Sequence, residues 1–451
     1  MKHANDLGKD KVSSLVLRLA IPSMLSQLVN VLYGIIDRMF IGHIPLIGDL
    51  ALAGVGVCGP IVTLLSSFGT LVGIGGSIMM AMKMGEGKKE DAKDILSNSF
   101  LMLVVFSAVL TTFFLLTKRY MINWFGGSPL TYEYANTYLT IYTIGTFFAL
   151  LAIGLNYFIT CQGFAMIGMM TVFVGAISNI ILDAVFIFVF KLGVAGAAWA
   201  TVISQFLSCI CALIFLFGKR VPIKITFANY KFSIIKKILS IGLSPFIIIA
   251  TDSVIIIAMN SVLQKYGGSQ GDLLISAATI LQSYFLLITG PLIGISGGTQ
   301  PIISYNYGAK NIERVKQSEK YIAYLALALT TSMFIISQVF PVYFVRFFTN
   351  NVETVKLATW GIKVFTLAII PLTFQYIFVD ALTALGRIKT ALFLSMFRKS
   401  IYLISVFILP VFFVAKYAFF AQPIADLISS VLSVIVFLKI FDKHLENRLC
   451  E

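Results

Sequence analysis

The sequence predicts an all-α integral membrane protein with twelve transmembrane helices in two six-helix lobes. Three observations lead to this prediction: an apolar composition, a series of long apolar stretches and an internal repeat. Of the 451 residues, 58% are hydrophobic and only 12% are charged. A soluble domain has roughly 25% charged residues. The composition therefore excludes a water-soluble globule and favours a membrane protein.

Twelve apolar stretches are long enough to cross a bilayer, which needs about 20 residues for each helix. Gly or Pro interrupts several of them, as helices in a bilayer tolerate. The predicted spans are 15–41, 52–82, 95–117, 135–160, 168–190, 194–217, 237–263, 274–306, 320–348, 357–385, 390–413 and 418–440.

Lys and Arg residues predict the orientation of these spans. If the N-terminus is cytoplasmic, the inner segments carry 23 basic residues and the outer loops carry 8, with Arg38, Arg398 and Lys399 inside spans. Because cytoplasmic loops are enriched in Lys and Arg, both termini are expected in the cytoplasm of a cell-membrane protein. The N-terminal residues also lack the apolar core of a secretory signal peptide.

The two halves of the chain match without a gap at an offset of 223 residues. Identical pairs at this offset include Pro22 with Pro245, Gly85 with Gly308, Tyr120 with Tyr343, and Phe125 with Phe348. Six spans in each half make the repeats parallel, about an axis along the membrane normal. The predicted parts are an N-terminal lobe over 1–217, a basic cytoplasmic linker over 218–236 and a C-terminal lobe over 237–451.

The sequence argues against several other functions. The basic residues lie in short runs between spans, which indicates cytoplasmic loops and no nucleic-acid groove. His3, His43 and His444 are expected in terminal or loop sequence, so a His-ligated metal site or a Ser-His-Asp hydrolase is not predicted. The five cysteines, Cys58, Cys161, Cys209, Cys211 and Cys450, form no CxxC pair. We expect them to be packing residues.

Five carboxylates fall within the predicted spans, at Asp37, Asp183, Asp252, Asp380 and Asp426. Each charge costs about 2.5–3.5 kcal/mol at the centre of a membrane helix, so each is expected to have a partner or a function. Asp426 is expected to pair with Arg398 or Lys399. Asp252 and Asp380 either face a substrate cavity in the second half and attract a cation, or pair locally.

The first half concentrates oxygen-bearing side chains around two of these acids. Asn179 and Asp183 are four residues apart and share a helix face, while Asn156 and Thr201 lie in the neighbouring spans. With Asp37, these residues supply hard oxygen ligands for a small cation or a proton. None of the residues equivalent to these five in the second half, at the offset of 223, is an acid. The equivalents are Asn260, Val379, Tyr402, Val406 and Ile424. The one-sided cluster therefore favours a functional role over neutralisation by Arg38 or interhelical hydrogen bonding.

The chain resembles the MATE (multidrug and toxic compound extrusion) transporters, and in particular their MepA-like bacterial branch. The resemblance rests on the Pro22–Asp37 spacing that continues as DRMFIGH, on LAGVG, and on GIGGS followed by KMGEGKKEDA in the first half. In the second half it rests on GPLIGISGGTQPIISYNYGAKNIERV, GRIKTA and AQPIAD. It covers nearly all of both halves.

The resemblance implies twelve helices around a central cavity and exchange of Na⁺ or H⁺ for amphipathic, often cationic, drugs. It implies a first-lobe cation site at Asp37, Asn156, Asn179, Asp183 and Thr201. All of these except Asn156 are candidate ligands of Na⁺. It also implies that α-helical bending occurs at Pro22 in the first span. No other cofactor is expected. The chain departs from the family in the second lobe, where GPLIG carries no acid and Asp252 and Asp380 lie outside the family's register.

These observations predict a multidrug antiporter and no enzyme. The expected partners are small organic cations and the lipid bilayer, and the chain is expected to act as a monomer. The alternative within transporters is a flippase for lipid-linked saccharides, whose cavity would need basic residues for a diphosphate. A membrane transferase would need clustered loop His, Asp or Glu, and a channel would need a filter-like loop. Neither feature is present in the sequence.

Overall fold

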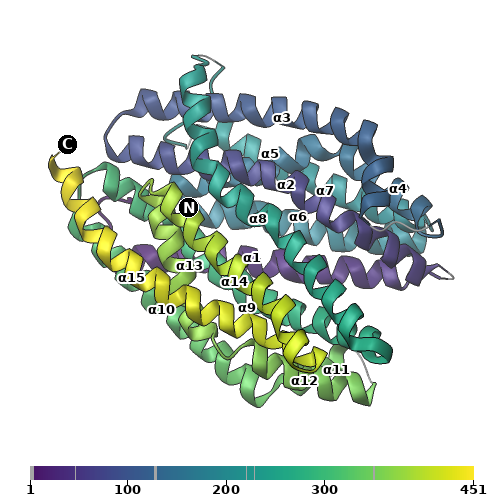
Figure 1. The fold of residues 1–451 in the computed structure, drawn as a ribbon. Helices are drawn as coiled ribbons and strands as arrows, with labels where there is room; N and C mark the ends of the chain where they lie inside the picture. Colours follow the sequence, from purple (N-terminus) through teal and green to yellow (C-terminus); the bar gives the residue numbers. More distant parts are fainter. Residues whose placement is uncertain are drawn as a thin grey trace. The chain divides into compact units, whose positions relative to one another are not determined.

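The computed structural model describes residues 5–45, 47–125, 129–219, 221–227, 229–348 and 351–450. Within these ranges, the side chains of residues 49, 253, 257, 269, 272 and 447–450 are not described. His3 and the side chain of Cys450 thus lie outside the described part of the chain. Figure 1 shows the elements along the chain, which in the described ranges are all helices.

The described part of the first half of the chain holds eight helices. They are α1 (Val12–Gly42), α2 (Gly48–Gly85), α3 (Lys89–Trp124), α4 (Tyr132–Ile144), α5 (Thr146–Cys161), α6 (Ala165–Ala184), the π-helix η1 (Val185–Val189) and α7 (Gly193–Phe217).

The second half follows the same order. Its elements are α8 (Phe232–Gly267), the 3₁₀-helix η2 (Gly268–Gln270), α9 (Gly271–Gly308), α10 (Ile312–Val339), α11 (Pro341–Phe348), α12 (Val352–Phe365), α13 (Ile369–Ala384), α14 (Ile388–Phe412), the 3₁₀-helix η3 (Ala415–Phe420) and α15 (Ala421–Cys450).

The predicted all-α membrane fold is confirmed. Ten helical segments of the described chain are long and apolar enough to span a membrane, and the count reaches twelve if each of two bent pairs is one span. The bent pairs are α4 with α5, at 57°, and α12 with α13, at 53°. They occupy corresponding places in the two halves. The predicted spans 135–160 and 357–385 are therefore broken helices.

Helix ends also repeat at the predicted offset of 223. The ends of α2 and α5 match those of α9 and α13, and the starts of α3 and α6 match those of α10 and α14. Gly163 and Gly386, which follow α5 and α13, both have a positive φ, at 88° and 78°. Glycine adopts this left-handed conformation without a steric penalty, so it can end a helix there.

Most predicted span ends shift by a few residues in the structure, and two predictions differ in kind. The span expected at 320–348 is divided, because α10 ends at Val339 and a separate short helix begins at Pro341. Proline cannot continue a helix but fits its first position. The last helix runs beyond residue 440, so His444 lies in the terminal part of the chain, as one alternative expected, but in a helix. It contacts Tyr307, whose hydroxyl lies 3.0 Å from His444 Nε2.

The chain packs into two compact units whose borders fall inside helices. Unit 1 contains Met1–Asp10 and Leu25–Ala250, and unit 2 contains Lys11–Met24 and Thr251–Glu451. The first part of α1 thus belongs to unit 2, and the first part of α8 belongs to unit 1. The lobes predicted by chain order stay a prediction, with their bounds at 1–217 and 237–451 and the linker at 218–236. The borders of the two compact units are at other places, within α1 and α8.

Glycines allow these exchanged helix segments to pack closely. In unit 2, a Cβ atom on Gly294 of α9 would lie 2.6 Å from Cα of Met24, and one on Gly298 would meet the side chain of Ser23. In unit 1, a Cβ on Gly75 of α2 would meet the backbone of Ile238 and Gly242 in α8. Gly75 and Gly298 are related by the repeat offset. Small residues let the backbones of membrane helices come close to each other. Both units therefore use a glycine at the same repeat position for close helix packing.

Each unit has its own apolar core. In unit 1 it includes the fully buried Leu65, Leu96, Leu103 and Phe158. In unit 2 it includes Ile288, Ile369 and Phe419. Because lipid tails are as apolar as these side chains, such cores stabilise a membrane protein mainly through close packing.

Candidate cation-binding site

The structure brings together two acids of unit 1 that lie far apart in the sequence. Asp37 is in the second part of α1, and Asp183 is in the last turn of α6. Asp37 is 8% exposed and Asp183 is completely buried. Their carboxyl groups lie within hydrogen-bonding reach of each other. Two carboxylates this close repel each other when both are charged. A bound cation, or a proton on one of them, would relieve this repulsion.

Asn179 and Thr201 extend this pair. Asn179 lies one turn before Asp183 on α6, and its Nδ2 is 3.4 Å from Thr201 Oγ1 on α7. The Thr201 hydroxyl in turn donates to the carbonyl of Ala197, at 3.1 Å. Both side chains are buried, at 1% and 3% exposure. Asn179 and Asp183 share a face of α6, and α7 packs against α6, so Thr201 lies beside this face.

The cluster has a surplus of buried oxygen atoms. In the described part of the chain, no hydrogen-bond donor reaches Asp37 Oδ1, Asn179 Oδ1 or either carboxylate oxygen of Asp183. Neither acid takes part in an ion pair there, and Arg38, the residue next to Asp37, is exposed. Burying an uncompensated carboxylate is costly. Arg38 thus lies within electrostatic reach of Asp37 but forms no ion pair with it in the described chain, and the unpartnered oxygens are available to a cation or a proton.

The donor set fits a monovalent cation or a proton. It consists of carboxylate, amide and hydroxyl oxygens, which are hard ligands. No group of three or more His, Cys, Asp or Glu that could hold a metal ion is found among the described residues. The oxygens of Asp37, Asn179, Asp183 and Thr201 would hold Na⁺, and the two carboxylates alone would hold a proton.

The structure does not bring Asn156 to this cluster. Its Nδ2 donates to the carbonyl of Gly168, at 2.8 Å, and to Thr171 Oγ1, at 2.7 Å. Thr171 lies eight residues before Asn179 on α6, which is about 12 Å along a helix axis. Asn156 therefore joins α5 to the first half of α6, away from the acid pair.

A tyrosine wall beside Asp37 was not anticipated from the sequence. Tyr33, one turn before Asp37 on α1, lies within electrostatic reach of both acids, and Tyr138 within reach of Asp37. The Tyr142 hydroxyl lies 3.4 Å from Ser66 Oγ and accepts a hydrogen bond from Gln205 Nε2, at 3.3 Å. The spacing of four residues between Tyr33 and Asp37 could have revealed the first of these.

The π-helix η1 begins two residues after Asp183. A π-turn inserted into a helix locally changes which side chains face its neighbours, and such turns are frequent at functional sites. Here it ends α6 and leads into the short connection to α7. The last turn of α6 thus holds Asp183 next to an irregular helical segment.

In unit 2 two of the remaining acids have cationic partners. Arg398 Nε lies 2.8 Å from Asp426 Oδ1, which confirms the predicted pair. Lys399 Nζ lies 2.6 Å from Asp252 Oδ1 and also donates to Thr251 Oγ1, at 2.8 Å. Asp252 thus follows the local-pairing alternative. Its role in a substrate cavity stays a prediction.

The fifth acid has polar neighbours and an acidic one. Ser296 and Gln300 of α9 donate hydrogen bonds to the carboxylate of Asp380 in α13. Glu319 of α10 lies within electrostatic reach of Asp380, and neither of its carboxylate oxygens has a hydrogen-bond partner in the described chain. Glu319 was not anticipated, because it falls one residue before the predicted span 320–348. A substrate-cavity role for Asp380 also stays a prediction.

Pro22 lies inside α1, which is one continuous helix from Val12 to Gly42. Proline lacks an N–H, so the helix has one backbone hydrogen bond fewer at this turn. The residues that follow, Ser23 and Met24, are those that approach Gly294 and Gly298 of α9. The predicted bending role of Pro22 is untested by this arrangement.

A polytopic helical fold built from two repeats, with acids placed inside its membrane helices, is typical of a membrane transporter. The MatE family model matches residues 22–185 and 246–408, once in each repeat. The chain therefore belongs to the MATE transporter family, as its resemblance predicted. Since this is a family of transporters, the prediction that the chain is not an enzyme is confirmed.

Two curated relatives and one solved structure show how far this similarity extends. The chain is 24% identical to "Multidrug export protein MepA" of Staphylococcus saprophyticus over 90% of this chain and 88% of that protein. It is 24% identical to the protein of the same name from Staphylococcus aureus, over 91% and 89% of the two chains. A structure described as an outward-facing multidrug resistance MATE family transporter superposes with a TM-score of 0.92 at 20% identity, covering 99% of this chain and 100% of that one.

Proposed function

We propose that this protein is a multidrug efflux transporter that exports amphipathic, mostly cationic, organic compounds in exchange for Na⁺ or H⁺. The relatives named as multidrug export proteins support the export function. The observation that carries the coupling is the buried pair of Asp37 and Asp183 with its unpartnered oxygens. We further propose that the protein works as a monomer in the cell membrane, with both termini in the cytoplasm.

Coupling in this proposal follows from the electrostatics of the pair. With neither proton nor Na⁺ bound, two adjacent buried carboxylates repel each other, which raises the free energy of any conformation that holds them together. A bound cation removes this repulsion. Its occupancy then shifts the balance between inward-open and outward-open forms by the difference between its affinities for them. The turn at Pro22, which lacks a hydrogen bond, is the proposed place where α1 bends.

Charge determines which compounds we expect to be exported. A cavity with an excess of acids attracts organic cations, and Met and Phe side chains adapt to varied shapes. The two cations near the middle of spans, Arg398 and Lys399, are already held by Asp426 and Asp252. A diphosphate-bearing saccharide would need free cations of this kind, so the pairs weigh against the flippase alternative.

The direct experiment is transport in proteoliposomes with Asp37→Asn and Asp183→Asn. Each amide keeps the shape of the side chain but removes the charge, so gradient-driven export of a cationic dye should fall to background. Asp91→Asn is the matched control, because Asp91 is an exposed acid in the first turn of α3. Imposing a pH gradient and a Na⁺ gradient separately identifies the coupling ion. Wild-type export rates in both variants would refute this coupling site.

Substrate preference has its own test, which does not depend on the coupling site. Matched cationic and anionic dyes are compared under the same driving ion. The proposal expects faster export of the cationic dye. Equal export of the two would contradict the cation-selective cavity while leaving the coupling site open to the variants above.

A further inference from the structure

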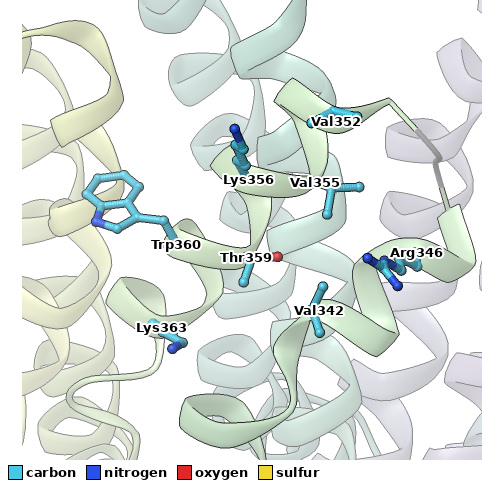
Figure 2. A pocket seen from close by; sticks show the side chains of 8 residues that line it. All are labelled: Val342, Arg346, Val352, Val355, Lys356, Thr359, Trp360 and Lys363. Carbon is cyan, nitrogen blue, oxygen red and sulfur yellow. The ribbon is translucent and has the colours of Figure 1, made fainter.

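A basic hollow lies between α11 and α12 in unit 2 (Figure 2). Its volume is about 770 Å³. Arg346 of α11 and Lys356 and Lys363 of α12 line it together with Val342, Val355 and Trp360. Ligand pockets have volumes of about 300–1,000 Å³, so the hollow has the size of a binding site. None of the eight residues that line it belongs to the acid clusters described above.

The positive charge of this hollow is uncompensated. Within the described chain, Arg346, Lys356 and Lys363 form no ion pair, and no Asp or Glu lines the hollow. Glu353, in the first turn of α12, is exposed and lies outside the lining. A further cation stands beside the hollow, because Lys416 Nζ lies 5.6 Å from the centre of the Trp360 ring. Four cations thus gather at one end of unit 2.

This concentration is unusual for the predicted outer side of the protein. The eight basic residues expected there are Lys118, Arg119, Lys191, Lys265, Arg346, Lys356, Lys363 and Lys416. Three of them line this hollow, and a fourth, Lys416, lies beside its Trp360. The first repeat has no counterpart, since Asn123, Glu133 and Thr140 stand at the positions equivalent to Arg346, Lys356 and Lys363. The basic cluster is therefore specific to the second half and is not required by the repeated fold.

The rest of the hollow and its rim are suited to the apolar part of a lipid. Valine side chains form one wall, and Thr359 Oγ1, drawn in Figure 2 beside them, has no hydrogen-bond partner among the described residues. On the same short helix α11, Tyr343 and Phe347 are 71% and 72% exposed. Aromatic residues in such positions mark the boundary between headgroups and acyl chains. Trp360 packs edge-on against Tyr417, at 6.1 Å between ring centres.

We propose that this hollow binds an anionic phospholipid. The phosphate would lie among Arg346, Lys356 and Lys363, since guanidinium and ammonium groups are the usual partners of phosphate. The headgroup and glycerol fill the volume, while the acyl chains continue over the exposed aromatic face of α11. Basic pockets next to membrane helices recognise anionic lipid headgroups in this way. The lipid site is independent of the proposed export function.

Trp360 provides a local probe, because the chain has only three tryptophans. With Trp124→Phe and Trp199→Phe, Trp360 is the sole indole, and its fluorescence is measured in nanodiscs that contain brominated lipid. We expect brominated phosphatidylglycerol to quench Trp360 at a several-fold lower mole fraction than brominated phosphatidylcholine does. Arg346→Gln, Lys356→Gln and Lys363→Gln together should abolish this difference, since each cation near a membrane surface contributes about fivefold in affinity.

The matched control neutralises three other outer cations with Lys118→Gln, Arg119→Gln and Lys191→Gln, and it should keep the lipid preference. If the triple variant of the hollow does not fold, the three single variants are measured and should each weaken the preference. Equal quenching by the two lipids, or an unchanged preference in the hollow variants, would overturn the proposal. Displacement of the lipid by millimolar inorganic phosphate would likewise overturn it, because the hollow would then be a site for a free anion.

Discussion

Arg398 and Asp426 form an ion pair with 2.8 Å between Nε and Oδ1, and the Asp426 side chain is fully buried in unit 2. Gln422 Nε2 donates to both carboxylate oxygens of the same acid, at 2.9 Å. Asp426 therefore has three hydrogen bonds from side chains of α14 and α15. Such a network holds a charge in the protein interior, but only while every member is present.

Asp426→Ala is expected to destabilise the protein by about 3–5 kcal/mol, because it leaves the Arg398 charge buried without its partner. Asp442→Ala is the matched comparison, since Asp442 and its partner Lys316 are both exposed, at 61% and 48%, and water can replace the carboxylate beside Lys316. Thermal unfolding of the two variants in detergent, followed by fluorescence, measures the difference. Similar losses of stability in both variants would show that the buried network contributes no more to stability than an exposed ion pair does.

Gly294 and Gly297 should respond in opposite ways to alanine, although both lie in α9. A Cβ on Gly297 meets nothing within 4 Å, so Gly297→Ala should stabilise the helix by about 0.5–1 kcal/mol. A Cβ on Gly294 would press against the backbone of Met24, and this overpacking should cost about 1–3 kcal/mol. The same unfolding measurement separates the two. A stabilising Gly294→Ala would mean that α1 can move away freely.

Glu86 should make stability depend on pH below neutrality. Burial raises its pKa, but Lys83 and Lys88, at 2.6 and 3.1 Å, outweigh this effect and hold the pKa at about 2, below the ordinary 4.5. A lowered pKa in the folded protein stabilises it above pH 4.5, and this contribution disappears as the pH falls towards 2. The melting temperature of wild type should exceed that of Glu86→Gln at pH 6, and the gap should narrow at pH 3. A constant gap would contradict this assignment.

Asn179 and Asn156 should differ in their effect on ion dependence. Asn179 reaches Thr201 beside the acid pair, so Asn179→Ala should raise the half-saturating concentration of the coupling ion about tenfold, as expected for losing a buried oxygen ligand. Asn156 instead bonds Gly168 and Thr171. Asn156→Ala should therefore lower stability and leave the ion dependence nearly unchanged. Equal shifts of ion dependence in the two variants would place Asn156 back in the site.

The orientation is tested by thiol labelling of intact cells. In a background without native cysteines, Lys88→Cys, Tyr230→Cys and Glu313→Cys should resist a membrane-impermeant maleimide, because the basic loops that hold them are expected in the cytoplasm. Glu133→Cys, on the predicted outer side, should react. All four native positions are exposed in the structure. Labelling of position 230 from outside would reverse the orientation.

Most of the membrane fold could be predicted from the sequence, because span length and the 223-residue offset are strong one-dimensional signals. Cys161 with Ala384, and Ala165 with Ile388, end and begin helices at corresponding positions. Breaks within spans could not be predicted as well. The 57° bend between α4 and α5 has no proline to mark it, and only Gly145 lies between the two helices.

The candidate site was predictable in part for a similar reason. Asp183 and Asn179 share a helix face by spacing alone, and an acid in a span requires an explanation wherever it occurs. Asn156 shows the limit of this reasoning. The sequence does not reveal whether its amide bonds the first half of α6, as it does in the structure, or the second half with Asn179 and Asp183. Glu319 shows another limit. It follows charged residues at 313–316 that resemble a loop, yet the helix carries it into the interior.

The division of α1 between two units has a consequence for biosynthesis. Residues 11–24 are among the first to leave the ribosome, but Gly294 and Gly298, against which they pack, follow about 270 residues later. At 5–20 residues per second, the delay is roughly 15–50 s. Unit 1 has the opposite dependence, because Gly75 waits for Ile238 and Gly242. A chain that stopped at residue 217 would therefore lack part of its own first unit. The first half of the chain cannot complete its packing until the start of α8 has been synthesised, and the N-terminal part of α1 has no packing partner until α9 has been synthesised.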